Sequence, residues 1–260
     1  DYSYAYTNTL VGDPGVGFPG AVYYDNAASA SVSGNYTVSF WLKPPASAFN
    51  YRYVVGSAYP WTSTDNSGRF KFIFSNNTSQ LYFYETDGNG SQSSGMATSE
   101  WEAGTTPWVH VCVTSTSTES VAGTLTAYFR GAILDTRTGI THVGTWTPQL
   151  YLGEDPRNNV TSYTAFSICD LSMWSKALSP AEVQELYNGG RTFDLKKHSA
   201  AGAYLRSWYR FGNGVSSSGA PDVSNAGWSG YVYDQVGEQS LNMRNMTTTQ
   251  FVEEAPGMEY

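Results

Sequence analysis

Charged residues are scarce in this 260-residue sequence, and basic residues are the scarcer kind. There are 14 Lys and Arg against 22 Asp and Glu, which gives a net charge of −8. Nucleic-acid binding requires clusters of basic side chains, and the nearest cluster, Lys196-Lys197-His198, is explained by a solvated loop. No apolar run approaches the roughly 18 residues of a membrane span. The sequence therefore argues against a nucleic-acid-binding protein and against an integral membrane protein.

Cysteine is also scarce, since Cys112 and Cys169 are the only two. They are too few for a disulfide scaffold and do not have metal-ligand spacing. Both lie in apolar, strand-like segments. Two buried thiols or one cross-strand disulfide, the latter indicating an oxidising compartment, are both compatible with this pattern.

Low charge combined with many Tyr, Thr, Ser and Asn residues is typical of an extracellular or particle-borne protein. The chain begins with Asp1 rather than Met, so we expect a processed, excised or engineered chain. Asn-x-Ser/Thr is a weak glycosylation signal because Ser and Thr are so abundant. This pattern occurs at Asn35, Asn76, Asn77, Asn89, Asn159 and Asn245.

Aromatic residues are abundant, with 20 Tyr, 12 Phe and 8 Trp. A chain this rich in aromatics buries enough apolar surface to offset its ordering entropy, which excludes a disordered protein. The dominant periodicity is two: in the segment 37–43, Val38, Phe40 and Leu42 share one face. Such alternation predicts half-buried strands. Similar segments are 70–74, 81–84, 109–113, 125–129 and 205–211.

Clusters of turn residues separate these strands, for example Asp65–Gly68, Asp87–Gly90 and Arg130-Gly131. Many strands without intervening helices predict an all-β, two-sheet antiparallel sandwich or jelly roll. One short helix is expected near 180–188, because Ser179 and Glu182 form a capping box around Pro180 and Gly189-Gly190 supplies a left-handed end.

Neither an internal repeat nor a low-complexity linker divides the sequence. We expect one domain over 1–260, in which 191–260 is a C-terminal extension that closes on the same sandwich. The Ser/Gly-rich stretch 215–230 predicts a long loop before a final pair of short strands.

Several segments, in order, carry a resemblance to a known family. They are 36–43, 108–114 followed by 125–131, 152–155, 170–174, and Ala177 to Val183. Together they resemble the laminin-G-like and pentraxin branch of the concanavalin A-like lectin/glucanase superfamily. The resemblance implies two antiparallel sheets, one of them concave. The segments 205–214, 233–237 and 241–247 resemble the tails of laminin-G-like proteins of marine phage particles, which implies a virion structural role.

The resemblance to pentraxins implies a calcium site built from Asp65, Asn66, Glu154 and Asp155. Calcium takes six to eight oxygen ligands, and these side chains supply suitable ones. A simple hairpin turn explains Asp65–Gly68 equally well, and the acidic loop after Glu154 looks shorter than in pentraxins. Lectins of this fold also stack aromatic rings on sugars. Among Trp41, Trp61, Trp101, Trp146 and Trp228, Trp61 is the preferred ligand-binding candidate, although packing of loops explains most of them.

Catalytic signals are weak. Endoglucanases of the superfamily carry paired carboxylates on one strand, but the nearest string, Glu85–Gly90, lacks the second Glu and predicts a hairpin loop. His110 and Cys112 share a strand face, where a catalytic dyad is conceivable and packing explains them better. We therefore expect no enzyme activity.

The expected function is that of a non-enzymatic recognition or structural module at a virion surface or in an extracellular assembly. The alternative is a calcium-dependent glycan-binding adhesin or lectin domain of a secreted protein. The expected partners are a glycan or the protein subunits of a particle, and homo-oligomerisation stays open.

Overall fold

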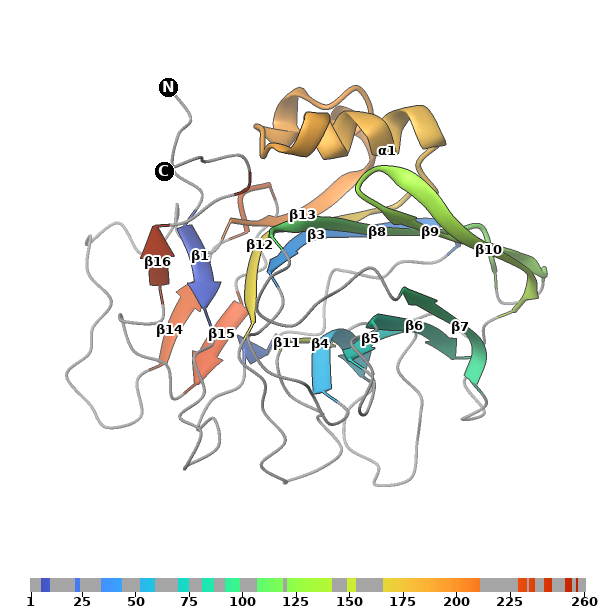
Figure 1. The fold of residues 1–260 in the computed structure, drawn as a ribbon, viewed down its shortest axis with the longest axis horizontal. Coiled ribbons are helices and arrows are strands. Elements are labelled where there is room, and N and C mark those ends of the chain that lie inside the picture. Colours follow the sequence, from blue (N-terminus) through green and yellow to red (C-terminus); the bar gives the residue numbers. More distant parts are fainter. Residues whose placement is uncertain are drawn as a thin grey trace.

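Two antiparallel sheets lie face to face, and short helices cover the outer side of one of them (Figure 1). This architecture comes from a computed structural model. The structure describes residues 6–9, 22–23, 34–43, 52–58, 70–74, 81–86, 92–98, 107–118, 121–141, 149–152, 166–210, 229–232, 234–236, 241–244, 251–253 and 256. The predicted all-β jelly-roll sandwich is confirmed.

Each sheet has eight strands among the described residues. Sheet A contains, in spatial order, β10 (Ala132–Ile140), β9 (Gly123–Phe129), β8 (Val109–Ser115), β3 (Tyr36–Lys43), β12 (Ser167–Trp174), β1 (Tyr6–Thr9) and β16 (Phe251–Glu253), with β13 (Leu205–Tyr209) also paired to β12. Sheet B contains β14 (Ser229–Val232), β15 (Leu241–Arg244), β2 (Val22–Tyr23), β11 (Gln149–Leu152), β4 (Arg52–Ala58), β5 (Phe70–Phe74), β6 (Leu81–Thr86) and β7 (Gln92–Thr98).

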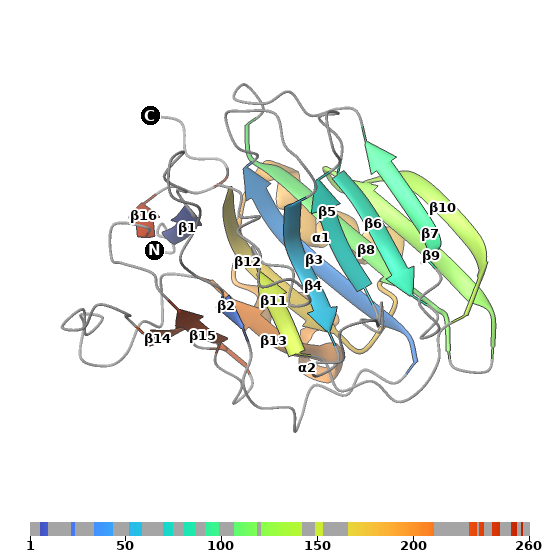
Figure 2. The same ribbon diagram turned by 90° about the horizontal axis from the view of Figure 1, so that it is seen from below.

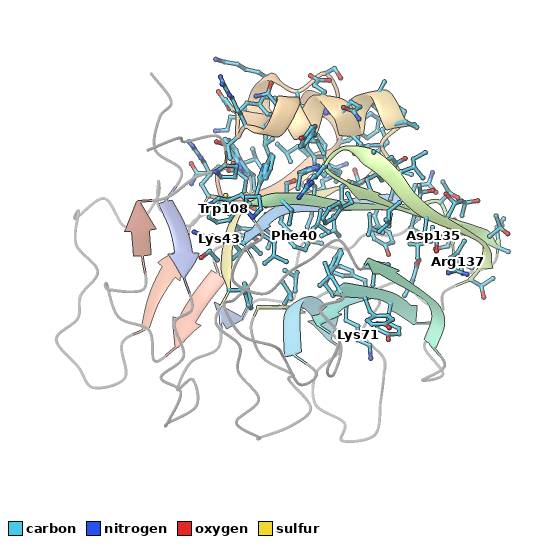
Figure 3. All side chains as sticks on the ribbon, viewed as in Figure 1. Phe40, Lys43, Lys71, Trp108, Asp135 and Arg137 are labelled. Carbon is cyan, nitrogen blue, oxygen red and sulfur yellow. The ribbon has the colours of Figure 1, made fainter. Side chains whose placement is uncertain are left out.

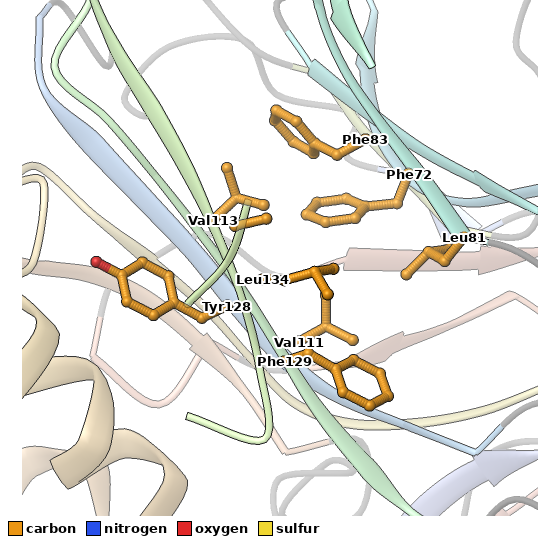
Figure 4. A pocket seen from close by; sticks show the side chains of 9 residues that line it. Phe72, Leu81, Phe83, Val111, Val113, Tyr128, Phe129 and Leu134 are labelled. Carbon is orange, nitrogen blue, oxygen red and sulfur yellow. The ribbon is translucent and has the colours of Figure 1, made fainter. Parts of the chain in front are cut away.

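The main core fills the space between the two sheets. Val38, Phe40 and Leu42 are fully buried there, as their alternation predicts. Phe40 of sheet A meets Phe72 of sheet B edge to face, with ring centroids 4.8 Å apart. An apolar gap of about 20 Å³ lies in this core between β5–β6 and β8–β10, where side chains of both sheets point toward one another (Figure 4).

A second apolar layer lies between sheet A and the helices. Helix α1 (Pro180–Tyr187) begins at the predicted capping box of Ser179 and Glu182 and buries Val183 and Leu186. Its end at Tyr187 falls one residue before the predicted end, where Asn188 adopts a left-handed conformation. The short elements η1 (Asn188–Gly190), η2 (Leu195–Lys197) and α2 (Ala201–Tyr204) follow. They are too short to give a periodic sequence signal.

Segments after residue 190 contribute strands to both sheets. Strand β13 ends at Tyr209, two residues before the predicted end, and β14 starts at Ser229, inside the stretch predicted as loop. Three strands, β14, β15 and β16, stand where a final pair was expected. Among the described residues, no helix is long and apolar enough to span a membrane.

Candidate functional site

The outer face of sheet B carries a group of large side chains on its central strands, whose outer side faces the viewer in Figure 2. Strand β5 alternates between inward Phe70 and Phe72, so Lys71 points outward. Strand β6 turns Leu81 and Phe83 into the core, which places Tyr82 and Tyr84 on the outer face. Figure 3 shows Lys71 directed away from the core.

Tyr82 and Tyr84 form a pair on this face. Their ring centroids are 5.9 Å apart and their planes differ by 19°, and both side chains are only half-buried. The ammonium of Lys71 lies 5.5 Å from the centroid of the Tyr84 ring, a cation–π contact. On the other side of Tyr84, the register places Gly95 of β7. The neighbour of Tyr82 on β7 is Ala97, so the Tyr pair stands beside a strand with little side-chain bulk.

This arrangement combines flat apolar rings, phenolic hydroxyl groups and one cation, that of Lys71, which is itself only 7% exposed. Aromatic faces pack against the apolar C–H faces of sugars, and the hydroxyl groups donate and accept hydrogen bonds. We define the outer-face site as Lys71, Tyr82, Tyr84 and the adjacent backbone of β7.

Glu85 lies on the opposite face of the same strand. The predicted hairpin is present, since β6 and β7 pair antiparallel, but Glu85 and Thr86 belong to β6 rather than to the loop, and Glu85 follows the inward alternation of Leu81 and Phe83. Its carboxylate is fully buried and accepts hydrogen bonds from Ser117 Oγ at 2.7 Å and Ser115 Oγ at 3.1 Å. It faces the interior of the sandwich, with no access to a cleft substrate. Asp87 lies outside the described residues.

His110 and Cys112, the residues considered as a catalytic dyad, lie on the face of sheet A that helix α1 covers. His110 Nε2 lies 2.8 Å from Ser39 Oγ, and Cys112 is also hydrogen-bonded to Ser39, so the serine lies between them. Burial lowers the pKa of His110 from 6.5 to about 3 and raises the pKa of the Cys112 thiol far above its usual value. Both groups are neutral and enclosed, which favours packing over nucleophilic chemistry.

The same face of sheet A also carries the two cysteines and Trp41. Cys112 and Cys169 are both free and buried. They flank β3 on opposite sides, since Cys112 is registered with Ser39 and Cys169 with Trp41, so a whole strand separates the two thiols and no disulfide joins them. Trp41 is buried and stacks with Tyr187 of α1 at 5.9 Å, which is the packing role expected for most of the tryptophans.

The predicted calcium ligands Asp65, Asn66, Glu154 and Asp155 and the ring of Trp61 lie outside the described residues. Within the described part of the chain, no group of three or more His, Cys, Asp or Glu residues could hold a metal ion. The outer-face tyrosines were not singled out from sequence. Their signal was available, because two tyrosines alternate with inward Leu81 and Phe83 on one strand.

The described residues form a two-sheet antiparallel sandwich with a half-buried aromatic pair on the outer face of sheet B, the architecture of lectin-like domains. The family comparison agrees: residues 20–184 match the laminin-G-type model of the concanavalin A-like lectin/glucanases superfamily. The chain therefore belongs to this superfamily. A comparison with curated protein sequences finds no match.

Solved structures of similar fold include a heptameric SAP-like pentraxin from Limulus polyphemus. It has 18% identity and a TM-score of 0.50, over 72% of this chain and 83% of the pentraxin chain. The binding domain of botulinum neurotoxin serotype D is also similar, with 18% identity and a TM-score of 0.51 over 70% of this chain. This chain spans only 41% of that neurotoxin chain. At these identities the likeness establishes the fold alone.

Proposed function

We propose that this protein is a non-enzymatic recognition module that binds carbohydrate on the outer face of sheet B. The observation that carries the proposal is the half-buried Tyr82–Tyr84 pair with the ammonium of the buried Lys71 beside it. Membership of a lectin-type superfamily supports it. So do the structural neighbours, one of which is described as a receptor-binding domain of botulinum neurotoxin D.

The absence of enzyme activity is part of this proposal. Retaining glycosidases need two carboxyl groups about 5–5.5 Å apart that face the substrate. Glu85, the nearest sequence candidate, is enclosed between the sheets and held by serine hydroxyls. The His110–Cys112 pair is equally enclosed. The burial of Glu85, His110 and Cys112 supports a role for these side chains in packing and hydrogen bonding rather than in catalysis.

A glycan array probed with the wild type and two variants tests the proposal. Tyr84→Ala removes one ring of the site. Tyr204→Ala is the control, because Tyr204 also has a lysine ammonium, that of Lys176, 5.2 Å from its ring centroid. Tyr204 is more exposed than Tyr84 and lies in α2 on the helical side. Binding that is lost in Tyr84→Ala and kept in Tyr204→Ala supports the proposal. An array without signal, or equal binding by all three proteins, contradicts it.

Calcium dependence is a second part of the proposal and rests on the resemblance to pentraxins. Asp65 and Asn66 lie between β4 and β5, and Glu154 and Asp155 follow β11, the neighbour of β4. Because β4 and β11 are antiparallel, the two segments leave this pair at opposite ends. Calcium should raise the melting temperature, and Asp65→Ala should remove that rise.

A second candidate function is a building block of a virion or other extracellular assembly. The resemblance of the tail segments 205–214, 233–237 and 241–247 to phage particle proteins favours it, and the pentraxin of similar fold is described as heptameric. Native mass spectrometry would show whether the chain forms closed oligomers. Detection of the chain in purified particles supports this function, and a monomer absent from particles contradicts it.

A further inference from the structure

Strand β12 changes its neighbour halfway along its length. Ser167, at its start, pairs with Thr9 of β1, whereas Leu171 pairs with Tyr209 of β13. Asp170 lies at this junction with φ of +48°, in the left-handed region that L-residues rarely adopt. The register with β3 also shifts here, between Cys169 and Ser172. The backbone is therefore strained at the point where the C-terminal extension joins sheet A.

The side chain of Asp170 holds Trp208 of β13. Oδ1 of Asp170 accepts a hydrogen bond from Trp208 Nε1 at 2.9 Å. The backbone N–H of Trp208 donates to Oδ1 of Asp234 at 2.8 Å, and Gln235 N–H donates to the Trp208 carbonyl at 2.8 Å. Asp234 lies between β14 and β15 of sheet B. Trp208 thus connects the junction in β12 with a segment that leads into the other sheet.

The carboxyl of Asp170 is compensated as an anion at only one of its two oxygens. The residue is only 4% exposed, and its Oδ2 has no hydrogen-bond partner. The guanidinium of Arg210 lies over the Trp208 ring at 5.2 Å, and its Nε forms an ion pair with Asp170 Oδ1 at 3.6 Å, a distance too long for a hydrogen bond. A buried carboxylate with one unpaired oxygen is costly, and a proton removes that cost.

We propose that Asp170 is a proton-controlled latch, in which proton uptake by its carboxyl fastens β13 and the 234–236 segment to the sandwich. Burial raises the pKa of Asp170 from 3.8 to about 6, although Arg210 and the Trp208 hydrogen bond act to lower it. We call the state with β13 and the 234–236 segment attached to the sandwich closed, and the state with them detached open. A raised carboxyl pKa means that the closed state binds the proton more tightly than the open state. The latch is therefore strongest below about pH 4 and loosens as the pH rises through 6.

Among the described residues, Arg210 is the charged group that acts on the Asp170 carboxyl. Arg210 of β13's extension and Asp234 of the 234–236 segment are the charged groups of the cluster. On the side of β3, the residues at the shifted register are Ser39 to Trp41, and on the side of β1 they are Asn8 and Thr9. None of these is charged, so the response to pH is assigned to Asp170 with Arg210 as its modifier.

Hydrogen exchange of the amides in 205–210, measured on the full chain at pH 5.0 and 7.5 and corrected for intrinsic rates, tests the latch. A shift from 3.8 to about 6 predicts an opening equilibrium constant roughly tenfold smaller at pH 5.0 than at pH 7.5. Asp170→Asn keeps an acceptor for Trp208 and tolerates the left-handed backbone, and it should abolish this tenfold difference. An equal pH difference in wild type and Asp170→Asn overturns the proposal.

Two variants of Arg210 provide a test that does not depend on the folding of Asp170→Asn. Arg210→Gln removes the cation that lowers the pKa of Asp170, so the midpoint of the pH response of 205–210 should move upward. Arg210→Lys keeps the charge and should leave the midpoint closer to that of the wild type. A midpoint that is the same in all three proteins contradicts the latch, because a merely structural role of Asp170 would not move it.

Discussion

Ser117 Oγ donates a hydrogen bond of 2.7 Å to the carboxylate of Glu85 across the interior of the sandwich. Ser117 follows β8 of sheet A, and Glu85 belongs to β6 of sheet B, so the bond joins the two layers. Both residues are fully buried. The carboxylate that most resembled a catalytic group in the sequence is thus part of what holds the sheets together.

Ser117→Ala should destabilise the protein, because it removes a buried donor from a buried carboxylate. Leaving a buried acceptor without its donor costs about 1–3 kcal/mol, and a loss of this size is expected in the free energy of unfolding by urea. Ser199→Ala is the matched control, since Ser199 Oγ also donates to a glutamate, Glu185, at 2.6 Å, but on the surface. It should cost less than about 0.5 kcal/mol. An equal loss of unfolding free energy in the two variants would contradict a stabilising role of the buried hydrogen bond between Ser117 and Glu85.

Gly131→Ala should destabilise the contact between the β9–β10 turn and helix α1. Gly131 has φ of +76°, and a Cβ there would lie 2.8 Å from Cβ of Tyr187. Gly139→Ala is the control for backbone strain alone. Gly139 has φ of +77°, as Gly131 nearly does, but a Cβ there would meet open space rather than a neighbouring side chain. Strain should cost about 1–2 kcal/mol in both variants, and overpacking should add about 1–3 kcal/mol at Gly131. Thermal unfolding that ranks the two variants equally would contradict the close approach of Tyr187.

His110 should make the protein less stable in mild acid. Its folded-state pKa of about 3 is below the ordinary 6.5, so the unfolded chain takes up a proton that the folded chain does not, and stability falls as pH drops from 6.5 toward 3. From pH 7 to pH 5 this contribution is about 2 kcal/mol. The destabilisation caused by His110→Gln should therefore be smaller at pH 5 than at pH 7 by about 2 kcal/mol in urea titrations. A cost that does not change with pH would mean that His110 takes up a proton as readily in the folded state as in the unfolded chain.

The strands and the helix could be predicted because their signals are local. Alternation in 37–43 predicts which side chains face the core, and Val38, Phe40 and Leu42 are indeed buried together. The capping box of Ser179 and Glu182 marks the start of α1 in the structure as in the sequence. The predicted turn at Arg130-Gly131 is present, with both residues at positive φ.

The candidate site and the latch depend on pairings between distant segments, which the sequence does not reveal. Tyr84 is placed beside Lys71 and Gly95 only by the order of β5, β6 and β7 in sheet B. Asp170 meets Trp208 because β12 exchanges β1 for β13 at that residue. The predicted calcium ligands remain a prediction, since they lie outside the described residues.

Titration calorimetry with a glycan selected on the array tests the central claim most directly. If the outer face of sheet B binds the sugar, Tyr84→Ala and Tyr82→Ala should each raise the Kd at least about tenfold, which corresponds to about 1.4 kcal/mol, while Tyr204→Ala leaves it unchanged. All three variants should melt close to the wild type, because Tyr82, Tyr84 and Tyr204 are not part of the core. An unchanged Kd in Tyr82→Ala and Tyr84→Ala would contradict recognition through this face.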